Sequence, residues 1–350
     1  MNVAQFLILL FLVGFCVSWL LTRMFCSGKR VNFLIDIPNE RSLHEYPVPR
    51  SGGIAILISL IVTIIFSFIF IDLSEFLVVY LGAFLLSIIS FYDDKNHIQA
   101  QYRLLSHTVI SFSIVFIFDF SLIVLRLPGV EWELPYFWGG LLCVVSTIWL
   151  INLYNFMDGM DGFASGMAII GFSTLAILGI VNDQLIYATG CISIVAAVAG
   201  FYIFNFPPAK IFMGDSGASV LGLLVATFII WADRHQIFPA WIGVLIFSAF
   251  IVDATATLMR RAINREKVWQ AHRTHYYQKL VQLGWGHKKT VMFEYLLMLS
   301  CGFSAILASL SSVVIQWIMI AVWVCMYAGL IFILNVYLSR YSQEERFKSN

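Results

Sequence analysis

Long stretches without a charged side chain constrain the fold of this chain more than any other feature of its sequence. A helix needs about 20 apolar residues to cross a hydrocarbon core about 30 Å thick. The charge-free stretches cover residues 1–22, 51–71, 76–92, 104–118, 134–157, 162–182, 184–209, 216–232, 235–252 and 295–339. The last is 45 residues long, enough for two crossings, with a serine-rich turn predicted at 309–312. We therefore expect eleven transmembrane helices, or ten if the short stretch 104–118 is not a span.

The composition excludes the main alternatives to a membrane protein. Only 12% of the residues are charged, and the mean hydropathy is +0.88. Soluble domains carry about 25% charged residues, so this chain lacks the charge needed to cover a soluble globule of its length. A soluble enzyme, a disordered chain and a strongly basic nucleic-acid binder are thereby excluded. We predict an all-α integral membrane protein with a single transmembrane domain over residues 1–350.

The basic residues indicate the orientation of the helices. If the N-terminus lies outside, all of the 21 lysines and arginines except Arg126 and Arg234 fall in cytoplasmic loops or in the C-terminal tail. Such a bias follows the positive-inside rule, so we expect the C-terminus in the cytoplasm. The longest outer loop alternates apolar and charged residues around Pro128-Gly129, which predicts a small periplasmic hairpin near 122–134.

Polar residues gather in five segments at the cytoplasmic ends of the predicted spans. These segments cover residues 23–50, 93–103, 152–162, 205–216 and 260–290. Charged and amide side chains near a membrane are costly and are usually retained for function. Since all five segments lie on one side, we predict an aqueous site at the cytoplasmic face, built by several helix ends.

The adjacent carboxylates Asp93 and Asp94 have several chemical uses. They can hold Mg²⁺, act as a general base or orient a cation at a phosphate. The alternative is solvated charge at the level of the lipid headgroups.

The third segment carries oxygen-bearing side chains every three residues. They are Asn152, Asn155, Asp158 and Asp161. A helix that continued through this segment would place all four along one face, where hard oxygen ligands suit Mg²⁺. The alternative is a capping and turn cluster, because Gly159 and Gly162 weaken a helix.

Two further segments suggest phosphate binding. The Gly214-Asp215-Ser216 sequence opens a predicted helix, whose free N–H groups can bind phosphate, although a simple helix cap is the alternative. His272 and His275 are three residues apart and could share one face of an amphipathic helix ending near Gly284. That face could bind a pyrophosphate, hold a metal or lie against lipid headgroups.

Taken in order, these motifs resemble a known family. The sequence contains DxPxxRxxHxxPxPRxGG from Asp36, the pair DD, then NxxNxxDGxDG, NxxPAKxFxGDSG and HRTHxY. Over about residues 32–277 it resembles the polyprenyl-phosphate N-acetylhexosamine-1-phosphate transferases of glycosyltransferase family 4. The segments SLHEYPVPRSGG and HRTHYYQKL look most like the O-antigen-initiating branch, which includes enzymes that use UDP-N-acetylfucosamine or UDP-N-acetylquinovosamine.

The resemblance implies roles for individual residues. Asp215 and Asn155 match metal ligands, and Asp93 and Asp94 match catalytic acids at the lipid phosphate, with Asp158 in the same cluster. The implied substrate-binding residues are Asp36, Arg50, Asp161, Asn205, Phe212, His272, Arg273 and His275. Among these, Asp161, Asn205 and Phe212 match the uridine pocket, and the two histidines with Arg273 match the basic motif around the diphosphate.

The sequence departs from the family pattern at two places. Some branches carry an acid or a lysine where this chain has His97, so Lys95 or Arg103 would supply the cation there. HRTH also contains fewer histidines than the motif of the lipid I enzyme. These departures bear on the contacts to the lipid phosphate and on sugar specificity.

The implied activity is transfer of a sugar 1-phosphate from a UDP-N-acetylhexosamine to undecaprenyl phosphate with release of UMP. The implied cofactor is Mg²⁺, with Mn²⁺ as a substitute, and the implied location is the bacterial inner membrane, where the product starts a cell-surface glycan such as O-antigen. Membrane lipid is a further expected partner, nucleic acid is not, and a homodimer is left open. The competing class is a transporter, for which Asp253 and Glu294 would be the ionisable residues inside the membrane.

Overall fold

The computed structural model describes residues 2–27, 34–38, 43, 46–96, 98–267 and 272–349, with side chains described as far as 338. Three residues named in the sequence motifs, Arg41, His44 and His97, lie outside the described residues, as do Lys29 and Arg30.

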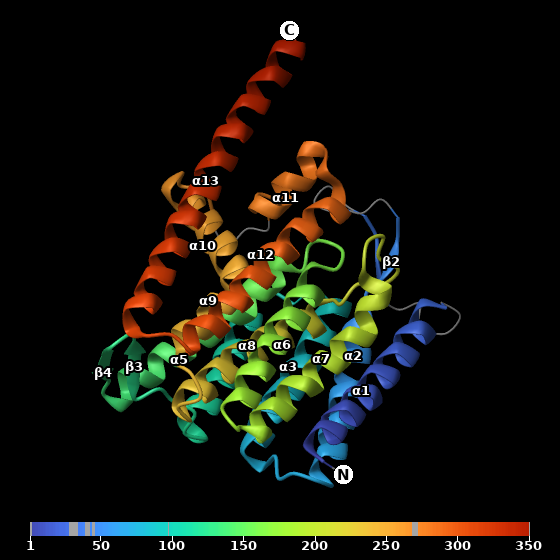
Figure 1. Cartoon of the computed structure of the whole chain (residues 1–350). Coiled ribbons are helices and arrows are strands. Elements are labelled where there is room, and N and C mark those ends of the chain that lie inside the picture. Colours follow the sequence, from blue (N-terminus) through green and yellow to red (C-terminus); the bar gives the residue numbers. More distant parts are fainter. Residues whose placement is uncertain are drawn as a thin grey trace.

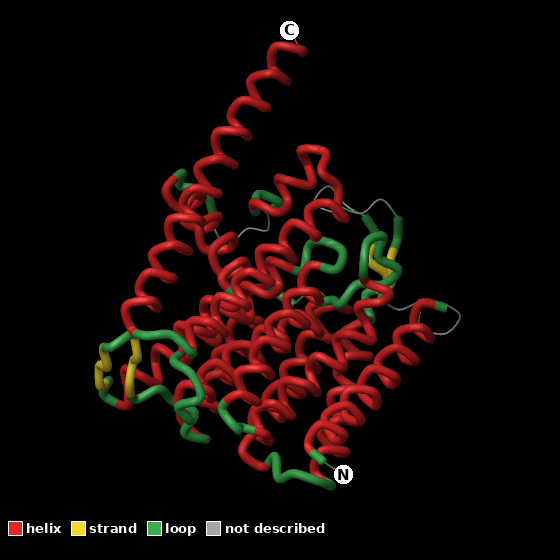
Figure 2. Tube along the Cα trace, in the orientation of Figure 1, coloured by secondary structure: helices red, strands yellow, loops and turns green. Residues whose placement is uncertain are grey.

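Helices form nearly all of the described chain and run side by side as one bundle (Figures 1 and 2). The helices are α1 (Val3–Cys26), α2 (Gly52–Phe68), α3 (Leu77–Asn96), α4 (Ala100–Phe112), α5 (Tyr136–Met157), α6 (Phe163–Val181), α7 (Leu185–Asn205), α8 (Asp215–Arg234), α9 (Ala240–Ile246), α10 (Ser248–Ile263), α11 (Tyr276–Leu280), α12 (Gly286–Ser309) and α13 (Val313–Ser349). A 3₁₀ turn covers Ser74–Phe76, and π-helical turns cover Ser113–Ile117 and Val281–Trp285. The strands β1 (Ile35–Asp36) and β2 (Val48–Pro49) form one antiparallel pair, and β3 (Val124–Leu127) and β4 (Val130–Glu133) form another.

The predicted all-α membrane fold is confirmed. In the described part of the chain, eight helices are long and apolar enough to cross a membrane, and the bent pair α9–α10 would make a ninth. The apolar helix α2 is shorter, and α4 with its π-helical turn occupies the weak stretch 104–118. The predicted turn near 309–312 is confirmed, because α12 ends at Ser309 and α13 begins at Val313.

The prediction of one continuous span over 235–252 is wrong. The chain bends by 81° between α9 and α10, and α10 continues to Ile263. Phe247 at the break has φ −95° and ψ 11°, and its buried ring packs beside Phe172 of α6, with ring centroids 6.0 Å apart. The bend carries the end of α10, where the fifth polar segment begins, toward α11.

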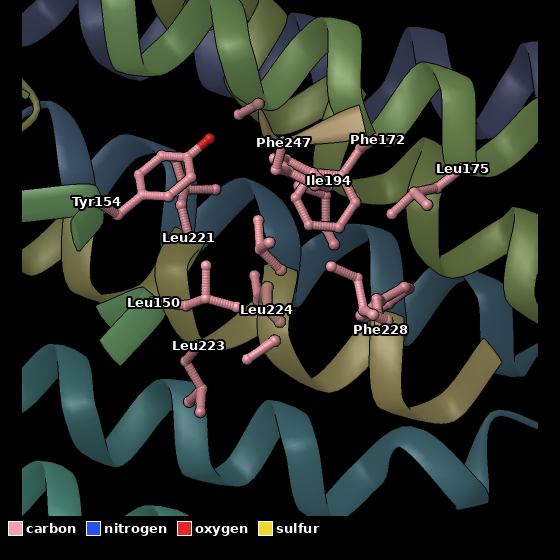
Figure 3. Close-up of a cluster of buried hydrophobic side chains, with 14 of the residues drawn as sticks. Leu150, Tyr154, Phe172, Leu175, Ile194, Leu221, Leu223, Leu224, Phe228 and Phe247 are labelled. Carbon is pink, nitrogen blue, oxygen red and sulfur yellow. The ribbon is translucent and has the colours of Figure 1, made fainter. Parts of the chain in front are cut away.

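Helix α8 forms the centre of the bundle. It is the most buried of the helices that could span a membrane, and α13 is the least buried. Figure 3 shows Leu221, Leu224 and Phe228 of α8 among side chains of α5 and α6. The helices approach closely at Gly222, where an added Cβ would lie 2.5 Å from the carbonyl oxygen of Leu150. Small residues at such crossings are what helix packing in lipid requires.

The predicted hairpin near 122–134 is confirmed as β3–β4, with Leu125 opposite Trp132. It lies near the C-terminal end of α8, because Arg126 pairs with Asp233. The polar segments meet at the other end, where α8 begins. A 20-residue helix spans about 30 Å, so the hairpin and the polar segments are separated by about the thickness of a hydrocarbon core.

Candidate active site

The start of α8 is the anchor of the polar end. Gly214 has φ +76°, a conformation that favours glycine, and α8 begins at Asp215 as predicted. The backbone N–H groups of Asp215 and Ser216 donate to the carboxylate oxygens of Asp94, at 3.2 and 3.1 Å. The amides that we proposed for phosphate therefore bind a fully buried carboxylate of this chain. The positive end of the helix dipole stabilises that carboxylate.

Two arginines connect three carboxylates at this point. Arg50 places Nη2 2.6 Å from Asp215 Oδ1 and Nε 3.5 Å from Asp94 Oδ1. Arg103 places Nη1 2.9 Å from Asp93 Oδ2 and 3.2 Å from Asp215 Oδ2. Arg103 of α4 thus supplies the cation expected beside the paired acids. We call these five residues the arginine–carboxylate network.

Backbone hydrogen bonds explain how Arg50 reaches the network. Phe212 N–H donates to the Pro49 carbonyl at 2.8 Å, and Gly52 N–H donates to the Phe212 carbonyl at 3.0 Å. At Gly53 an added Cβ would lie 2.5 Å from the backbone nitrogen of Gly217, so the starts of α2 and α8 meet at a contact that only glycine permits. The first and fourth polar segments are held together by their main chains.

The prediction of a continuous helix through the third segment is wrong beyond Met157. Helix α5 ends there, Asp158 follows as the C-terminal cap, and Gly162 with φ +72° starts α6. The glycines break the helix, as the alternative interpretation required. Asn152 lies within α5 but makes its contacts elsewhere, because its Nδ2 donates to the Ile148 carbonyl at 2.7 Å and lies 3.3 Å from Nδ1 of His107 in α4.

Eight of the predicted site residues nevertheless line one cavity of about 280 Å³. They are Asp36, Arg50, Asn155, Asp158, Asp161, Asn205, Phe212 and Asp215. Asp93 lies beside this cavity and lines a small space with Arg103, Asn155 and Asp215. The structure thus brings together residues from the first four polar segments.

Two of the lining residues are held by other parts of the chain. Asp161 lies with Oδ1 3.1 Å from His287 Nδ1, while its Oδ2 accepts from Ala209 N–H at 2.9 Å. Asn205 accepts from Ser165 Oγ at 2.7 Å and donates to the Ile211 carbonyl at 2.9 Å. These contacts fix the third segment against the fourth, so both residues shape the cavity wall.

Burial and charge perturb the acids and histidines of the site. Burial raises the pKa of Asp158 well above its usual value, and the nearby carboxylates of Asp215 and Asp94 act in the same direction against Arg50. Burial lowers the pKa of His272 to about 4, assisted by the adjacent His275 and by Arg261. Four carboxyl groups line the cavity, those of Asp36, Asp158, Asp161 and Asp215, with Arg50 as the arginine among the described lining residues, so the cavity can accept a further cation.

The oxygen donors fit Mg²⁺. Asn155, Asp158 and Asp215 line the same cavity, and Asn155 is held in place by Ser219 Oγ at 2.9 Å. The described residues contain no group of three or more histidines, cysteines and carboxylates placed to chelate a metal. Mg²⁺ binds through one or two carboxylates together with water and substrate phosphates, so this donor set suits it.

The prediction of a helix that contains His272 and His275 is wrong about where that helix begins. Helix α11 begins at Tyr276, so His275 is its N-cap and His272 precedes it, although the helical segment does end near Gly284 as predicted. The two imidazole rings lie 4.8 Å apart. Neither they nor Arg273 line the cavity, where Gln278 and His287 represent the fifth segment instead. The proposed role of His272, Arg273 and His275 at a diphosphate stays a prediction.

Sequence reasoning missed three residues that organise the site. Asp253 of α10 accepts hydrogen bonds from Tyr276 N–H at 2.9 Å and Tyr277 N–H at 3.0 Å, and its Oδ1 lies 3.5 Å from His275 Nδ1. The only signal for it was a carboxylate inside an apolar stretch, which we had assigned to the transporter alternative. His287 and Gln278 lie in a segment that was singled out, but nothing in the sequence indicates which of its residues reach the cavity.

The fold and the site together define a multi-pass membrane protein with an acidic cavity at one end of the bundle, lined by Arg50 and with Arg103 beside it. Residues 76–233 match the family described as Glycosyl transferase family 4. A probable undecaprenyl-phosphate N-acetylglucosaminyl 1-phosphate transferase from Bacillus subtilis is 26% identical over 309 residues, which cover 87% of this chain and 82% of the relative. A phospho-N-acetylmuramoyl-pentapeptide-transferase from Staphylococcus epidermidis is 28% identical over 284 residues, which cover 75% of this chain and 86% of the relative. The family match and both relatives support a similarity of this chain to the polyprenyl-phosphate hexosamine-1-phosphate transferases.

Proposed function

We propose that the protein transfers N-acetylhexosamine 1-phosphate from a UDP-sugar to undecaprenyl phosphate. The observation that carries this proposal is the arginine–carboxylate network, which borders a cavity large enough for part of a nucleotide sugar. The names of the relatives support the same reaction class. The location that we propose is the bacterial inner membrane, with the cavity at the cytoplasmic face, because the basic residues cluster at that end.

In the proposed reaction, an oxygen of the lipid phosphate attacks the β-phosphorus of the UDP-sugar. A new phosphorus–oxygen bond forms to the lipid, and the bond between the β-phosphorus and the bridging oxygen breaks. The bridging oxygen leaves with UMP, so no oxidant or water is consumed. Arg103, which pairs with Asp93, would hold the attacking phosphate, since a guanidinium binds phosphate oxygens well.

Arg50 would stabilise the charge that develops on the diphosphate, because it lines the cavity and is oriented by Asp94 and Asp215. Mg²⁺, held by Asp215 and Asn155 with Asp158 nearby, would add positive charge at the same diphosphate. Three other residues that line the cavity, Phe212, Asp161 and Asn205, would shape the nucleoside pocket. His272, Arg273 and His275 would contribute only if their loop closes on the substrate.

The test is UMP release by the full chain in vesicles with undecaprenyl phosphate. UDP-N-acetylglucosamine, UDP-N-acetylfucosamine and UDP-N-acetylquinovosamine would be compared, with and without a chelator. We expect release that needs both lipid and Mg²⁺, restored in part by Mn²⁺, and preference for one of the last two sugars if the chain initiates O-antigen. Asp215→Asn should abolish release, whereas Asp119→Asn, which breaks the exposed ion pair with Arg234, should not.

Two outcomes would contradict the proposal. If Asp215→Asn released UMP as fast as wild type, the assignment of Asp215 as a Mg²⁺ ligand would be wrong. Passage of the UDP-sugar across the vesicle membrane without UMP release would favour the transporter.

A further inference from the structure

A second groove lies between α10, α11, α12 and α13, outside the catalytic cavity. It has a volume of about 410 Å³ and apolar walls that include Leu297 of α12 and Leu334 of α13. The groove stays open because α13 packs only loosely against the other helices and reaches beyond the bundle (Figure 1). A gap of this kind between membrane helices is filled by hydrocarbon.

One polar side chain in the groove wall lacks a partner. Glu294 of α12 is 8% exposed, and among the described residues its carboxyl group takes part in no hydrogen bond. A carboxyl group without a hydrogen bond beside an apolar groove is costly, which favours an occupant that supplies a polar partner. The occupant must therefore carry a polar atom below its headgroup as well as a hydrocarbon chain.

Two cations stand where the groove meets α11. Arg260 Cζ and Lys279 Nζ lie 5.0 and 5.5 Å from the centre of the Tyr276 ring, which lines the groove. Within the described structure, Arg260 Nη1 is buried without a hydrogen-bond partner, whereas Nη2 donates to the Thr274 carbonyl at 2.7 Å. This end of the groove can therefore bind an anion such as a phosphate.

We propose that the groove binds one anionic phospholipid. Its acyl chain would lie along the apolar walls, an ester group would meet the Glu294 carboxyl group, and its phosphate would lie at Arg260 and Lys279. A polyprenyl phosphate fits less well, because its chain carries no oxygen below the phosphate to meet Glu294. The site is distinct from the cavity of the proposed reaction and does not depend on that reaction.

The groove is joined to the catalytic side through α11. Tyr276 lines the groove with its ring, donates its main-chain N–H to Asp253, and places its hydroxyl 3.3 Å from Asn335 Oδ1 of α13. Asp253 in turn contacts His275. A bound phospholipid would therefore hold α13 against α11 and stabilise the loop that carries the HRTH motif.

The test uses the full chain in nanodiscs of phosphatidylcholine, alone or mixed with phosphatidylglycerol, with bound lipid measured by native mass spectrometry. Wild type should retain one phosphatidylglycerol. Leu297→Trp should lose it by filling the groove, whereas Leu299→Trp on the exposed face of α12 should keep it. Leu334→Trp, on the loosely packed α13, gives a second blocking variant if the first does not fold. Lys279→Gln should weaken retention about fivefold, the ratio for about 1 kcal/mol per basic residue near a lipid surface.

Three results would overturn the proposal. These are equal retention of both phospholipids by the wild type, unchanged retention in both blocking variants, and displacement by undecaprenyl phosphate but not by phosphatidylglycerol. A change of oligomeric state in Leu297→Trp without loss of lipid would identify a second copy of the chain as the occupant.

Discussion

Both ends of α8 carry arginine–aspartate ion pairs, but the two sets differ in how accessible they are and in how many partners they share. At the C-terminal end, Arg126 pairs with Asp233, whose side chain is fully buried. The remaining Asp233 oxygen accepts from Ala240 N–H at 2.6 Å, and Arg126 also donates to the Asp233 carbonyl at 3.0 Å. Arg126 Nε also lies 3.4 Å from Glu131 Oε1 of β4, so these charges fasten the β3–β4 hairpin to the turn between α8 and α9.

At the N-terminal end, one partly exposed carboxylate is shared by two arginines. Asp215 contacts both Arg50 and Arg103, while each arginine also contacts a second carboxylate. The Asp215 side chain is 22% exposed, against 0% for Asp233. A carboxylate that is shared and partly exposed can exchange one partner for a substrate phosphate or a metal. The buried Asp233 carboxylate already has Arg126 and the Ala240 N–H on its two oxygens, so we expect it to stabilise the fold.

Replacing the arginine at each end should separate these roles most clearly. Arg50→Met should lower kcat about 10²–10³-fold, the usual loss when a donor that stabilises developing charge is removed. Arg126→Met should leave kcat per folded molecule within a few-fold of wild type. The measurement is UMP release normalised to folded protein, and equal losses in both variants would remove the functional distinction between the two ends.

The same two substitutions should rank the other way in their effect on stability, with the larger loss for Arg126→Met. Arg126→Met leaves Asp233 buried without its cation, which should cost about 3–5 kcal/mol of unfolding free energy. Arg50→Met should cost less, because Asp94 and Asp215 keep backbone or Arg103 contacts. Thermal unfolding in one detergent checks this, and a smaller shift for Arg126→Met than for Arg50→Met would contradict it.

The contact between Gly53 of α2 and Gly217 of α8 should be needed to position Arg50 in the arginine–carboxylate network. Gly53→Ala must push α2 away from Gly217 and so displace Arg50, and we expect about a tenfold loss of kcat, equivalent to about 1.4 kcal/mol. Gly329→Ala is the matched control, because no atom lies within 4 Å of the added Cβ. Similar kinetics for the two variants would show that Arg50 does not depend on this contact.

His287 should affect substrate binding more than chemistry, because it holds Asp161 at the side of the cavity away from the network. His287→Ala should raise KM for the UDP-sugar several-fold with a smaller change in kcat. His287→Asn, which retains a hydrogen-bond donor, should recover part of the loss. A fall in kcat at unchanged KM would place His287 in the chemical step instead.

The smallest expected effect concerns His272 and pH. Its pKa is lowered to about 4 in the folded protein, against about 6.5 unfolded, so folding favours the neutral ring. The associated stability is present above pH 6.5 and is lost as the pH falls toward 4. His272→Gln should therefore show a smaller fall in Tm between pH 7 and pH 5 than wild type. An identical fall would mean that His272 is not held neutral.

Much of the site could be located from the sequence, but its internal arrangement could not. The spacing of Asn152, Asn155, Asp158 and Asp161 suggested one helical face, yet the chain turns at Asp158 and only the last three line the cavity. The sequence showed Asp253 as a charge in an apolar stretch. Its contact with α11 depends on the bend at Phe247, which no local sequence pattern predicted.

The sequence by itself determined that the chain is a helical membrane protein and which segments carry its polar chemistry. The physical reason is that hydrocarbon excludes charge and forces backbone hydrogen bonds within each helix, so length and apolarity can be read residue by residue. The tertiary structure alone decided which carboxylate meets which arginine. Arg50 and Asp215 are 165 positions apart, and they meet because Gly53 and Gly217 let two helix starts touch. Such contacts depend on how helices dock, and docking is a property of complementary surfaces rather than of any single segment.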